Sequence, residues 1–210
     1  MRVALIGATG YVGTAVCARL VDNGHHVIRL VRTPKPTEAT NGSVSTVAGD
    51  ALDGDALDRT VAGVDAVIHA LGVGGRGDGA DTTLFSDSVR LTLAAMERND
   101  VRRIVCLSNI GAGGSGGAFA NRFVIPVFLR WLRPIISDKD RMEALLAASH
   151  ADWVSVRLPN VVDGPDTALV TNADGRGLKH RINLSAAARF LVEQVEIDEH
   201  VCTAVCVANR

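Results

Sequence analysis

One stretch near the start of the chain, MRVALIGATGYVG, limits the possible folds more than any other. An apolar run, Val3–Ile6, leads into Gly7, Gly10 and Gly13, and a helix-compatible stretch from Tyr11 to Val21 follows. This order predicts a strand, a tight turn and a helix start. Gly7 permits the turn, Gly10 lets the main chain approach a phosphate, and Gly13 thins the helix where it crosses the strand. The free N–H groups of the first helical turn would face an anion; an ordinary loop is the alternative.

Apolar strand-like runs alternate with helical segments along the rest of the chain. The runs are apolar on successive residues, which is typical of strands buried on both faces of a parallel sheet. Strands are expected at Val27–Val31, Val44–Val47, Val64–Ala70, Arg103–Leu107 and Trp153–Leu158, and helices at Asp53–Val61, Asp81–Arg98, Ser137–Ser149 and Ser185–Val195. The alternation predicts one α/β domain over residues 1–210, a doubly wound parallel sheet with helices on both faces and a ligand crevice at the carboxyl ends of its strands.

The net charge and the lengths of the apolar runs limit the kinds of molecule that this protein is expected to bind. The chain has 210 residues, 47% of them hydrophobic, and a formal net charge of -1. A chain this close to neutrality is not expected to attract nucleic acid or an anionic membrane nonspecifically. The layout of a signal peptide is missing, and no apolar run reaches the roughly 20 residues of a membrane span. We therefore expect a cytoplasmic protein whose partner is a small-molecule substrate.

The four cysteines lie in segments that should be regular structure. They are Cys17, Cys106, Cys202 and Cys206, and this placement predicts reduced, buried thiols. Cys202 and Cys206 would share one face of a strand. Because no second pair of ligands lies nearby, we expect no metal site.

The second strand ends in the sequence RTPK at Arg32–Lys35, where this type of fold contacts the adenosine ribose. An acidic residue there accepts a hydrogen bond from the 2′-hydroxyl of NAD, whereas an arginine accommodates the 2′-phosphate of NADP. No acidic residue occurs between Arg29 and Thr37, whereas Arg29, Arg32 and Lys35 are basic. The sequence favours NADP (NADPH) over NAD. Solvated basic residues on an exposed turn are the alternative.

Two further strand ends should border the dinucleotide. Asp50 and Ala51 follow the third strand, and the fourth strand leads into the loop that starts at Ala70. Both ends lie where the adenine and the pyrophosphate would bind. His69 falls inside the apolar fourth strand, so we expect a hydrogen-bonded core histidine and not a catalytic one. The glycine-dense loop from Gly72 to Gly79 could close over the cofactor.

The fifth strand ends in Ser108 and Asn109, hydrogen-bonding residues placed where nicotinamide and substrate should meet; a serine that only caps the loop is the alternative. A glycine-rich run to Gly117 follows, and then an aromatic and basic stretch, Ala118–Ile136, in which Pro126 interrupts helical geometry; together they make up the insertion 111–136. We expect a lid-like insertion over the substrate site, with apolar walls and with arginines that meet carboxylates or phosphates. The residues concerned are Phe119, Arg122, Phe123, Phe128, Arg130, Trp131 and Arg133. An amphipathic helix on the core or a membrane-surface helix are the alternatives.

Together these motifs resemble the atypical short-chain dehydrogenase/reductase families, and within them the small NAD(P)H-binding, NmrA-like reductases related to biliverdin-IXβ (flavin) reductase. The motifs span nearly the whole chain, at Gly7–Gly13, Leu30–Arg32, Gly49–Asp50, Asp65–Ile68, Ser137–Glu143, Trp153–Pro159 and Asp163–Pro165. The resemblance implies a Rossmann-like fold and hydride transfer from a nicotinamide cofactor, with the protein supplying orientation and a dry pocket.

The chain departs from the wider superfamily in its proton donor. Active members use a Tyr-x-x-x-Lys pair, whereas the single tyrosine here is Tyr11 in the phosphate turn. Lys139 and Glu143 stand in a Lys-x-x-x-Glu spacing that puts both on one helical face. The resemblance implies that Lys139 approaches the nicotinamide ribose or the substrate; a surface ion pair is the alternative. Asn160 replaces a histidine of the biliverdin-reducing relative, which argues against tetrapyrrole specificity.

We therefore expect an NADPH-dependent reductase of a conjugated organic acceptor, namely a flavin, tetrapyrrole, quinone or carbonyl. Ser108 and Asn109 would stabilise the anion formed as hydride arrives, and Lys139 would supply the proton that a ketone needs. The cofactor is expected to contact Gly7, Thr9, Gly10, Tyr11, Val12, Gly13, Arg32, Thr33, Asp50, Ala51, Ala70, Leu71, Gly72, Ser108, Pro159 and Asn160. The alternatives are a non-catalytic NADP(H)-sensing regulatory protein and a non-redox isomerase or cyclase of secondary metabolism. We expect a monomer or a homodimer.

Overall fold

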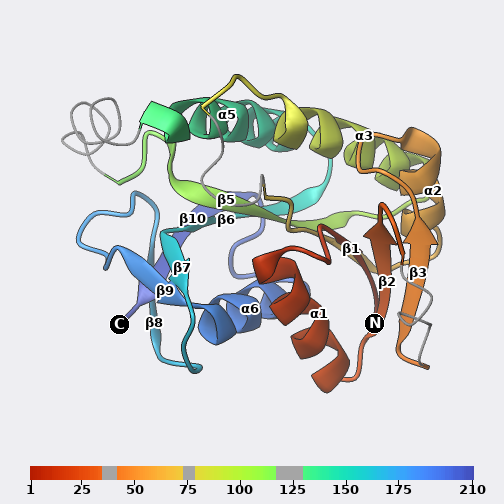
Figure 1. Cartoon of the computed structure of the whole chain (residues 1–210), viewed down its shortest axis with the longest axis horizontal. Helices are drawn as coiled ribbons and strands as arrows, with labels where there is room; N and C mark the ends of the chain where they lie inside the picture. The colour runs from red at the N-terminus through yellow and green to blue at the C-terminus, as the bar shows by residue number, and fades with distance from the viewer. Residues whose placement is uncertain (35–41, 73–78, 117–129) are drawn as a thin grey trace.

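A single large sheet organises the fold. The computed structural model describes residues 1–34, 42–72, 79–116 and 130–210. Its eight-stranded sheet has the order β3-β2-β1-β4-β5-β6-β10-β8, with helices on both faces (Figure 1). Neighbouring strands are parallel except for β10 and β8, which pair antiparallel. The predicted doubly wound, Rossmann-like α/β sheet is confirmed.

The helices and strands follow the order of the predicted ones. The sheet contains β1 (Arg2–Ile6), β2 (His26–Val31), β3 (Val44–Ala48), β4 (Ala66–His69), β5 (Arg103–Gly113), β6 (Asp152–Leu158), β8 (Leu169–Asn172) and β10 (Thr203–Asn209). The helices are α1 (Tyr11–Asp22), α2 (Gly54–Val61), α3 (Leu84–Arg98), the short 3-10 helix η2 (Arg130–Leu132), α5 (Arg133–Ala147) and α6 (Leu184–Glu193). A separate two-stranded sheet pairs β7 (Asn160–Val162) with β9 (Arg181–Asn183).

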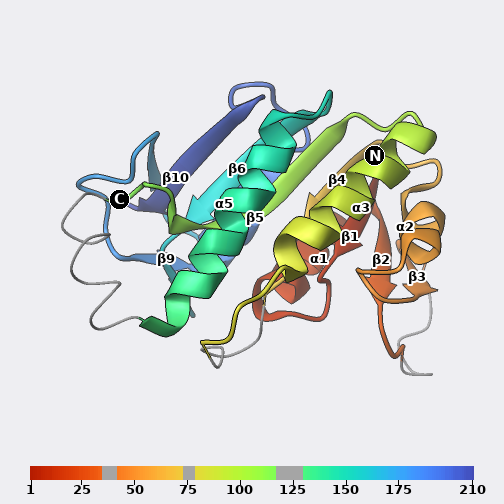
Figure 2. The same cartoon turned by 90° about the horizontal axis from the view of Figure 1, so that it is seen from above.

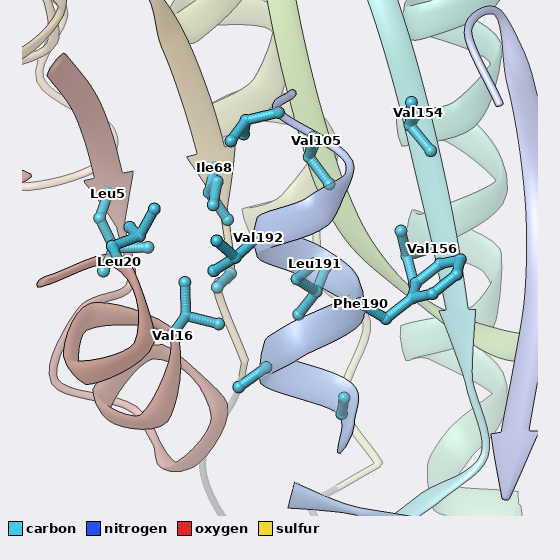
Figure 3. Close-up of a cluster of buried hydrophobic side chains, with 14 of the residues drawn as sticks. Leu5, Val16, Leu20, Ile68, Val105, Val154, Val156, Phe190, Leu191 and Val192 are labelled. Atoms are coloured by element: carbon cyan, nitrogen blue, oxygen red, sulfur yellow. The ribbon is translucent and has the colours of Figure 1, made fainter. Parts of the chain in front are cut away.

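Each face of the sheet buries its own hydrophobic cluster. Helices α1 and α6 cover one face, whereas α2, α3 and α5 cover the other (Figures 1 and 2). Side chains of a strand point alternately to the two faces, so β1 sends Val3 and Leu5 into the first cluster and Ala4 and Ile6 into the second. Figure 3 shows the first cluster, in which residues of α6 such as Leu191 pack on the central strands. Because both faces are covered, the open carboxyl ends of the strands are left for a ligand.

Several boundaries differ from the expected ones. β5 continues to Gly113, so residues 111–113 of the expected lid are strand, and residues 117–129 lie outside the described residues. α5 begins at Arg133 instead of Ser137. Pro134 is compatible with this start, because N–H groups in the first turn of a helix have no partner inside the helix, so the N–H that proline lacks is not missed there. The strands β7, β8 and β9 were not expected, because each is only three or four residues long and none is a continuous apolar run.

The prediction for the cysteines is partly wrong. Cys106 and Cys206 are buried, Cys17 is half-buried, and Cys202 is exposed; all four are free thiols. Cys202 does not share a strand face with Cys206, because it precedes β10 and has a positive φ of 57°. In the part of the chain that the structure describes, no helix is long and apolar enough to span a membrane.

Helix α1 packs directly against the turn after β1, and this close contact depends on the absence of a side chain at Gly13. A Cβ on Gly13 would lie 2.0 Å from the carbonyl oxygen of Gly7, a backbone atom that cannot rotate away. The helix and the turn are therefore in direct contact, as the sequence predicts for this glycine.

We expect Gly13→Ala to lower the free energy of unfolding by about 1–3 kcal/mol, because the added methyl forces α1 away from the turn. Urea denaturation followed by circular dichroism measures the change. Gly54→Ala is the matched control, since a Cβ there meets nothing within 4 Å at the start of α2. Equal stability of Gly13→Ala and the wild type would contradict the close packing.

Candidate functional site

The turn between β1 and α1 forms one end of the site. Gly7 has a φ of +87°, and a Cβ there would lie 2.6 Å from the carbonyl oxygen of Ala70. The N–H of Gly10 donates to the carbonyl of Gly7 at 3.0 Å, and Gly10 is the N-cap of α1, with no side-chain cap. The first N–H groups of α1 therefore stay available at a helix terminus that favours negative charge. This arrangement suits a phosphate group.

A single groove connects this turn to the middle of the sheet edge. It has a volume of about 1720 Å³. Twelve of the expected cofactor residues line it: Gly7, Thr9, Gly10, Tyr11, Val12, Arg32, Thr33, Asp50, Ala51, Ala70, Leu71 and Gly72. Asn109 and Lys139 line it too, together with the apolar Phe85, Trp131 and Ile135. A ligand with a phosphate-bearing end and an aromatic end fits a groove of this volume and lining.

Four expected residues do not line the groove. Gly13 lies behind the phosphate turn, where it allows the helix to pack. Asn160 is the first residue of β7 and Pro159 directly precedes it, and Ser108 is fully buried. Direct contacts of these residues with a cofactor stay predictions. Of the expected lid, the structure describes residues 111–116 and 130–136; in the second part Trp131 lines the groove and Arg133 is exposed.

The end of the groove next to β2 is where the sequence predicts the adenosine ribose, and Arg32 is the cation there whose side chain is free of the other described residues. Arg32 is exposed directly after β2, lines the groove, and has no hydrogen-bond or ion-pair partner among the described residues. Asp50 lies in the turn after β3, where its Oδ1 accepts the N–H of Leu52 at 2.9 Å. Lys35 and the loop between Gly72 and Gly79 lie outside the described residues.

The side chain of Tyr11 connects the turn between β1 and α1 to the loop after β7, which is distant in the sequence. Its hydroxyl donates to Oδ1 of Asp163 at 2.6 Å, and this hydrogen bond raises the pKa of the Tyr11 phenol. Three residues further along the same loop, the carboxylate of Asp166 accepts a hydrogen bond from the Arg19 guanidinium of α1 at 2.9 Å. The loop that follows β7 is therefore attached along α1, beside the turn where a phosphate would bind.

Lys139 lies at the other end of the groove, and its amine is buried. Its Nζ donates to the carbonyl of Leu107 at 2.6 Å and lies 3.8 Å from the centre of the Phe85 ring. Burial lowers the pKa of Lys139 to about 8, because an ammonium loses its hydration inside the protein. The expected alternative, a surface ion pair between Lys139 and Glu143, is wrong: Lys139 is 1% exposed and Glu143 8%.

Glu143 instead collects three donors from the neighbouring strands. Ser108 and Ser155 each donate to its Oε1 at 2.8 Å. Arg157 donates from Nε to Oε1 at 3.0 Å and from a terminal nitrogen to Oε2 at 2.5 Å. The Arg157 guanidinium and both hydroxyls outweigh burial and hold the pKa of Glu143 below its usual value. The hydroxyl of Ser108 is therefore engaged beneath the groove, on the α5 side of the sheet.

The sequence did not reveal the role of Asp138. Its carboxylate is fully buried and accepts the N–H of Phe85 at 2.8 Å and the hydroxyl of Ser86 at 2.5 Å. Asp138 of α5 thus caps the N-terminus of α3 from outside, a position where an anion is stabilised. This contact places Phe85 beneath the Lys139 amine. A cap supplied by a residue 53 positions away has no local sequence signal.

His69 is a core residue, as predicted. It is fully buried, and its Nε2 lies 2.8 Å from the Ser88 hydroxyl. Burial, helped by the positive charge of Lys139, lowers the pKa of His69 to about 3. The imidazole is therefore neutral at physiological pH.

Comparison with known proteins shows the family to which the chain belongs. A profile of the family described as NAD(P)H-binding matches residues 7–198. A 2-alkyl-3-oxoalkanoate reductase of Stenotrophomonas maltophilia is 28% identical over 211 residues, covering 94% of this chain and 62% of the relative. An uncharacterised protein of Mycobacterium tuberculosis is 28% identical over 157 residues, 75% of this chain but 14% of the longer protein. The chain thus spans less than two thirds of the length of either relative.

Solved structures show the same fold at low sequence identity. A short-chain dehydrogenase/reductase of Veillonella parvula in complex with NADP has a TM-score of 0.79 and 14% identity, covering 99% of this chain and 94% of the other. A Streptococcus pneumoniae protein thought to be an NADH-flavin reductase has a TM-score of 0.79 and 21% identity, with full coverage of both chains. At these identities the likeness concerns the fold.

We expect the buried His69 to make stability depend on pH. Its pKa falls from the usual 6.5 to about 3 on folding, so the unfolded chain binds the extra proton between these values. Its contribution is present above pH 6.5 and is lost as the pH falls towards 3, by about 2 kcal/mol between pH 7 and pH 5. Urea denaturation of the wild type and His69→Gln at both pH values measures it. The exposed His150→Gln is the control, and an equal pH dependence in all three proteins would contradict the assignment.

Proposed function

The chain belongs to the NAD(P)H-binding family, and on that premise we propose that it is an NADPH-dependent reductase that transfers a hydride to a conjugated organic acceptor. The acceptor would be a flavin, a tetrapyrrole, a quinone or a carbonyl compound. The observation that carries the proposal is the buried amine of Lys139, which opens into the same groove as the glycine turn. A relative that is a reductase of 2-alkyl-3-oxoalkanoates supports a carbonyl among these classes.

The described residues fit a dinucleotide cofactor. The backbone at Gly7 and Gly10 leaves room for a phosphate, and the N-terminus of α1 offers unpaired N–H groups to it. Arg32 offers a cation that has no partner among the described residues at the proposed adenosine end, which favours NADPH. When bound, the nicotinamide cofactor supplies the hydride. The chain's own residues would orient the acceptor, exclude water and handle the proton.

Lys139 would give up the proton, from Nζ. Its pKa of about 8 is close enough to neutrality for the ammonium to be both populated and acidic. The Leu107 carbonyl and the Phe85 ring hold the amine at one position of the groove. Asn109, exposed to the same groove, would donate a hydrogen bond to the developing anion. Because Ser108 donates to Glu143, we assign it to the support of this site.

A protein that only senses NADP(H) is the second candidate. It is favoured by the lack of the Tyr-x-x-x-Lys pair. NADPH consumption with flavin, tetrapyrrole, quinone and ketone acceptors separates the two, together with the mass of the product. A product heavier by two hydrogens supports the reductase, an unchanged mass indicates isomerisation, and binding without turnover of any acceptor indicates a sensor.

We expect Lys139→Met to lower kcat with a ketone acceptor about 100-fold or more, because the proton donor is lost. Methionine fills a similar volume without a buried charge, so the thermal midpoint and the Kd for NADPH should be retained. In the wild type, kcat should be constant below pH 8 and fall about tenfold per pH unit above it, as Lys139 loses its proton. Full turnover by the variant would remove Lys139 from the mechanism.

We expect Arg32→Glu to raise the Kd for NADPH about 10–100-fold and to leave the Kd for NADH nearly unchanged, because only NADPH carries the 2′-phosphate. Fluorescence titration with each cofactor measures both constants. Arg133→Glu is the matched control, since it changes the net charge equally at an exposed residue that does not line the groove. An unchanged Kd for NADPH in Arg32→Glu would overturn the assignment of the 2′-phosphate.

A further inference from the structure

The buried ion pair between Glu143 and Arg157 lies next to the proposed proton donor and is not explained by cofactor binding. Neither residue lines the groove. Their side chains are each 10% exposed, and Ser108 and Ser155 complete the shell of donors around the Glu143 carboxylate. Burying two charged groups costs free energy that their mutual attraction often only offsets. Stability alone therefore does not explain why this ion pair is buried here, which points to a role in the function of the site.

The geometry links this pair to Lys139. Glu143 follows Lys139 by one helical turn on the same face of α5. The two side chains bind consecutive residues of β5, since Lys139 donates to the carbonyl of Leu107 and Glu143 accepts from the hydroxyl of Ser108. Arg157 and Ser155 tie the same carboxylate to β6. The turn of α5 that carries the amine is thus attached to two strands at once.

We propose that Glu143 is the positioning residue for Lys139, held by Arg157 so that its carboxylate fixes where the amine lies and how readily it releases a proton. The proposal rests on the proposed role of Lys139 as the proton donor. Without a nearby anion, a fully buried lysine would lose its proton too early to act as an acid near neutral pH.

Among the described residues, the negative charges near Lys139 are the carboxylates of Glu143 and Asp138, because the thiol and the imidazole near the amine are both neutral. Cys106 of β5 is neutral, because burial raises the pKa of its thiol to about 12. His69 of β4 is neutral, since its pKa is about 3. Asp138 of α5 is bound to the N-terminus of α3 and to Arg141 at 3.3 Å. Both carboxylates raise the pKa of Lys139 against the effect of burial, and Glu143 is the one attached to β5 and β6.

The composition of the chain permits a direct test without turnover. It contains three lysines, Lys35, Lys139 and Lys179, so carbon-13 labelling of the lysine ε-carbons gives three NMR signals. Lys139→Met identifies the signal of Lys139. A pH titration of the whole protein then reports the charge of this amine, and the ring current of Phe85 reports its position over the ring.

We expect Glu143→Gln to lower the ratio of ammonium to amine at Lys139 about tenfold at pH 8, because the carboxylate one helical turn away is removed while the Arg157 cation that it neutralised stays. The upper limb of the kcat profile should move to lower pH by the same amount. Ser155→Ala is the control: it removes a hydrogen bond to the same carboxylate but keeps the charge, so the titration of Lys139 should stay where it is. If Glu143→Gln does not fold, the Arg157→Gln background decides: there Glu143→Gln removes the carboxylate without leaving the Arg157 cation unpaired, and relative to Arg157→Gln alone it should shift Lys139 in the same direction.

An unchanged titration of Lys139 in folded Glu143→Gln, or in the double variant relative to Arg157→Gln, would overturn the proposal. A shift of equal size in Ser155→Ala would also overturn it, because loosened packing would then explain the effect. A shift of the Lys139 signal in a protein that reduces no acceptor would uphold the positioning role and reject the proposed function. The two proposals therefore fail separately.

Discussion

The buried ion pair of Arg157 and Glu143 is the constraint on which the polar end of this structure depends. Arg157 reaches from β6 with two hydrogen bonds to the carboxylate of Glu143 on α5. Removing one partner of such a pair leaves a buried charge and typically costs about 3–5 kcal/mol. The pair therefore attaches α5 to β6 at the turn that carries Glu143.

Neighbouring residues of α5 extend the same attachment. Asp138 caps α3, Lys139 binds the end of β5, and Asp140 accepts the N–H of Gly113 at 2.6 Å. One helix thus connects a second helix and two strands through side chains within two turns. This is the physical basis for a buried amine that can lie at a defined place in an otherwise apolar part of the groove.

The two ends of the groove are built on different principles. At the glycine turn the contacts are between backbone atoms, and the site exists because side chains are missing at Gly7 and Gly13. At the Lys139 end, charged side chains from distant segments meet in a buried environment. The first kind of site has a short local pattern, whereas the second depends on the packing of several elements, which explains why the backbone geometry of the first could be predicted and the contacts of the second could not. The nucleotide-binding family of this chain followed from the local pattern.

The amino-acid sequence by itself determined the order of the main strands and helices, the parallel sheet, the glycine turn between β1 and α1 and the core position of His69, because apolar periodicity and glycine geometry act over a few residues. Only the tertiary structure decided that Ser108 turns to Glu143 instead of the groove, that Asp138 caps α3, and that Lys139 and Glu143 bind different partners. The Lys-x-x-x-Glu spacing is compatible with a surface ion pair and with two buried contacts. Which of them forms depends on the donors that β5 and β6 bring to the helix, and these are set by the pairing of strands far apart in the chain.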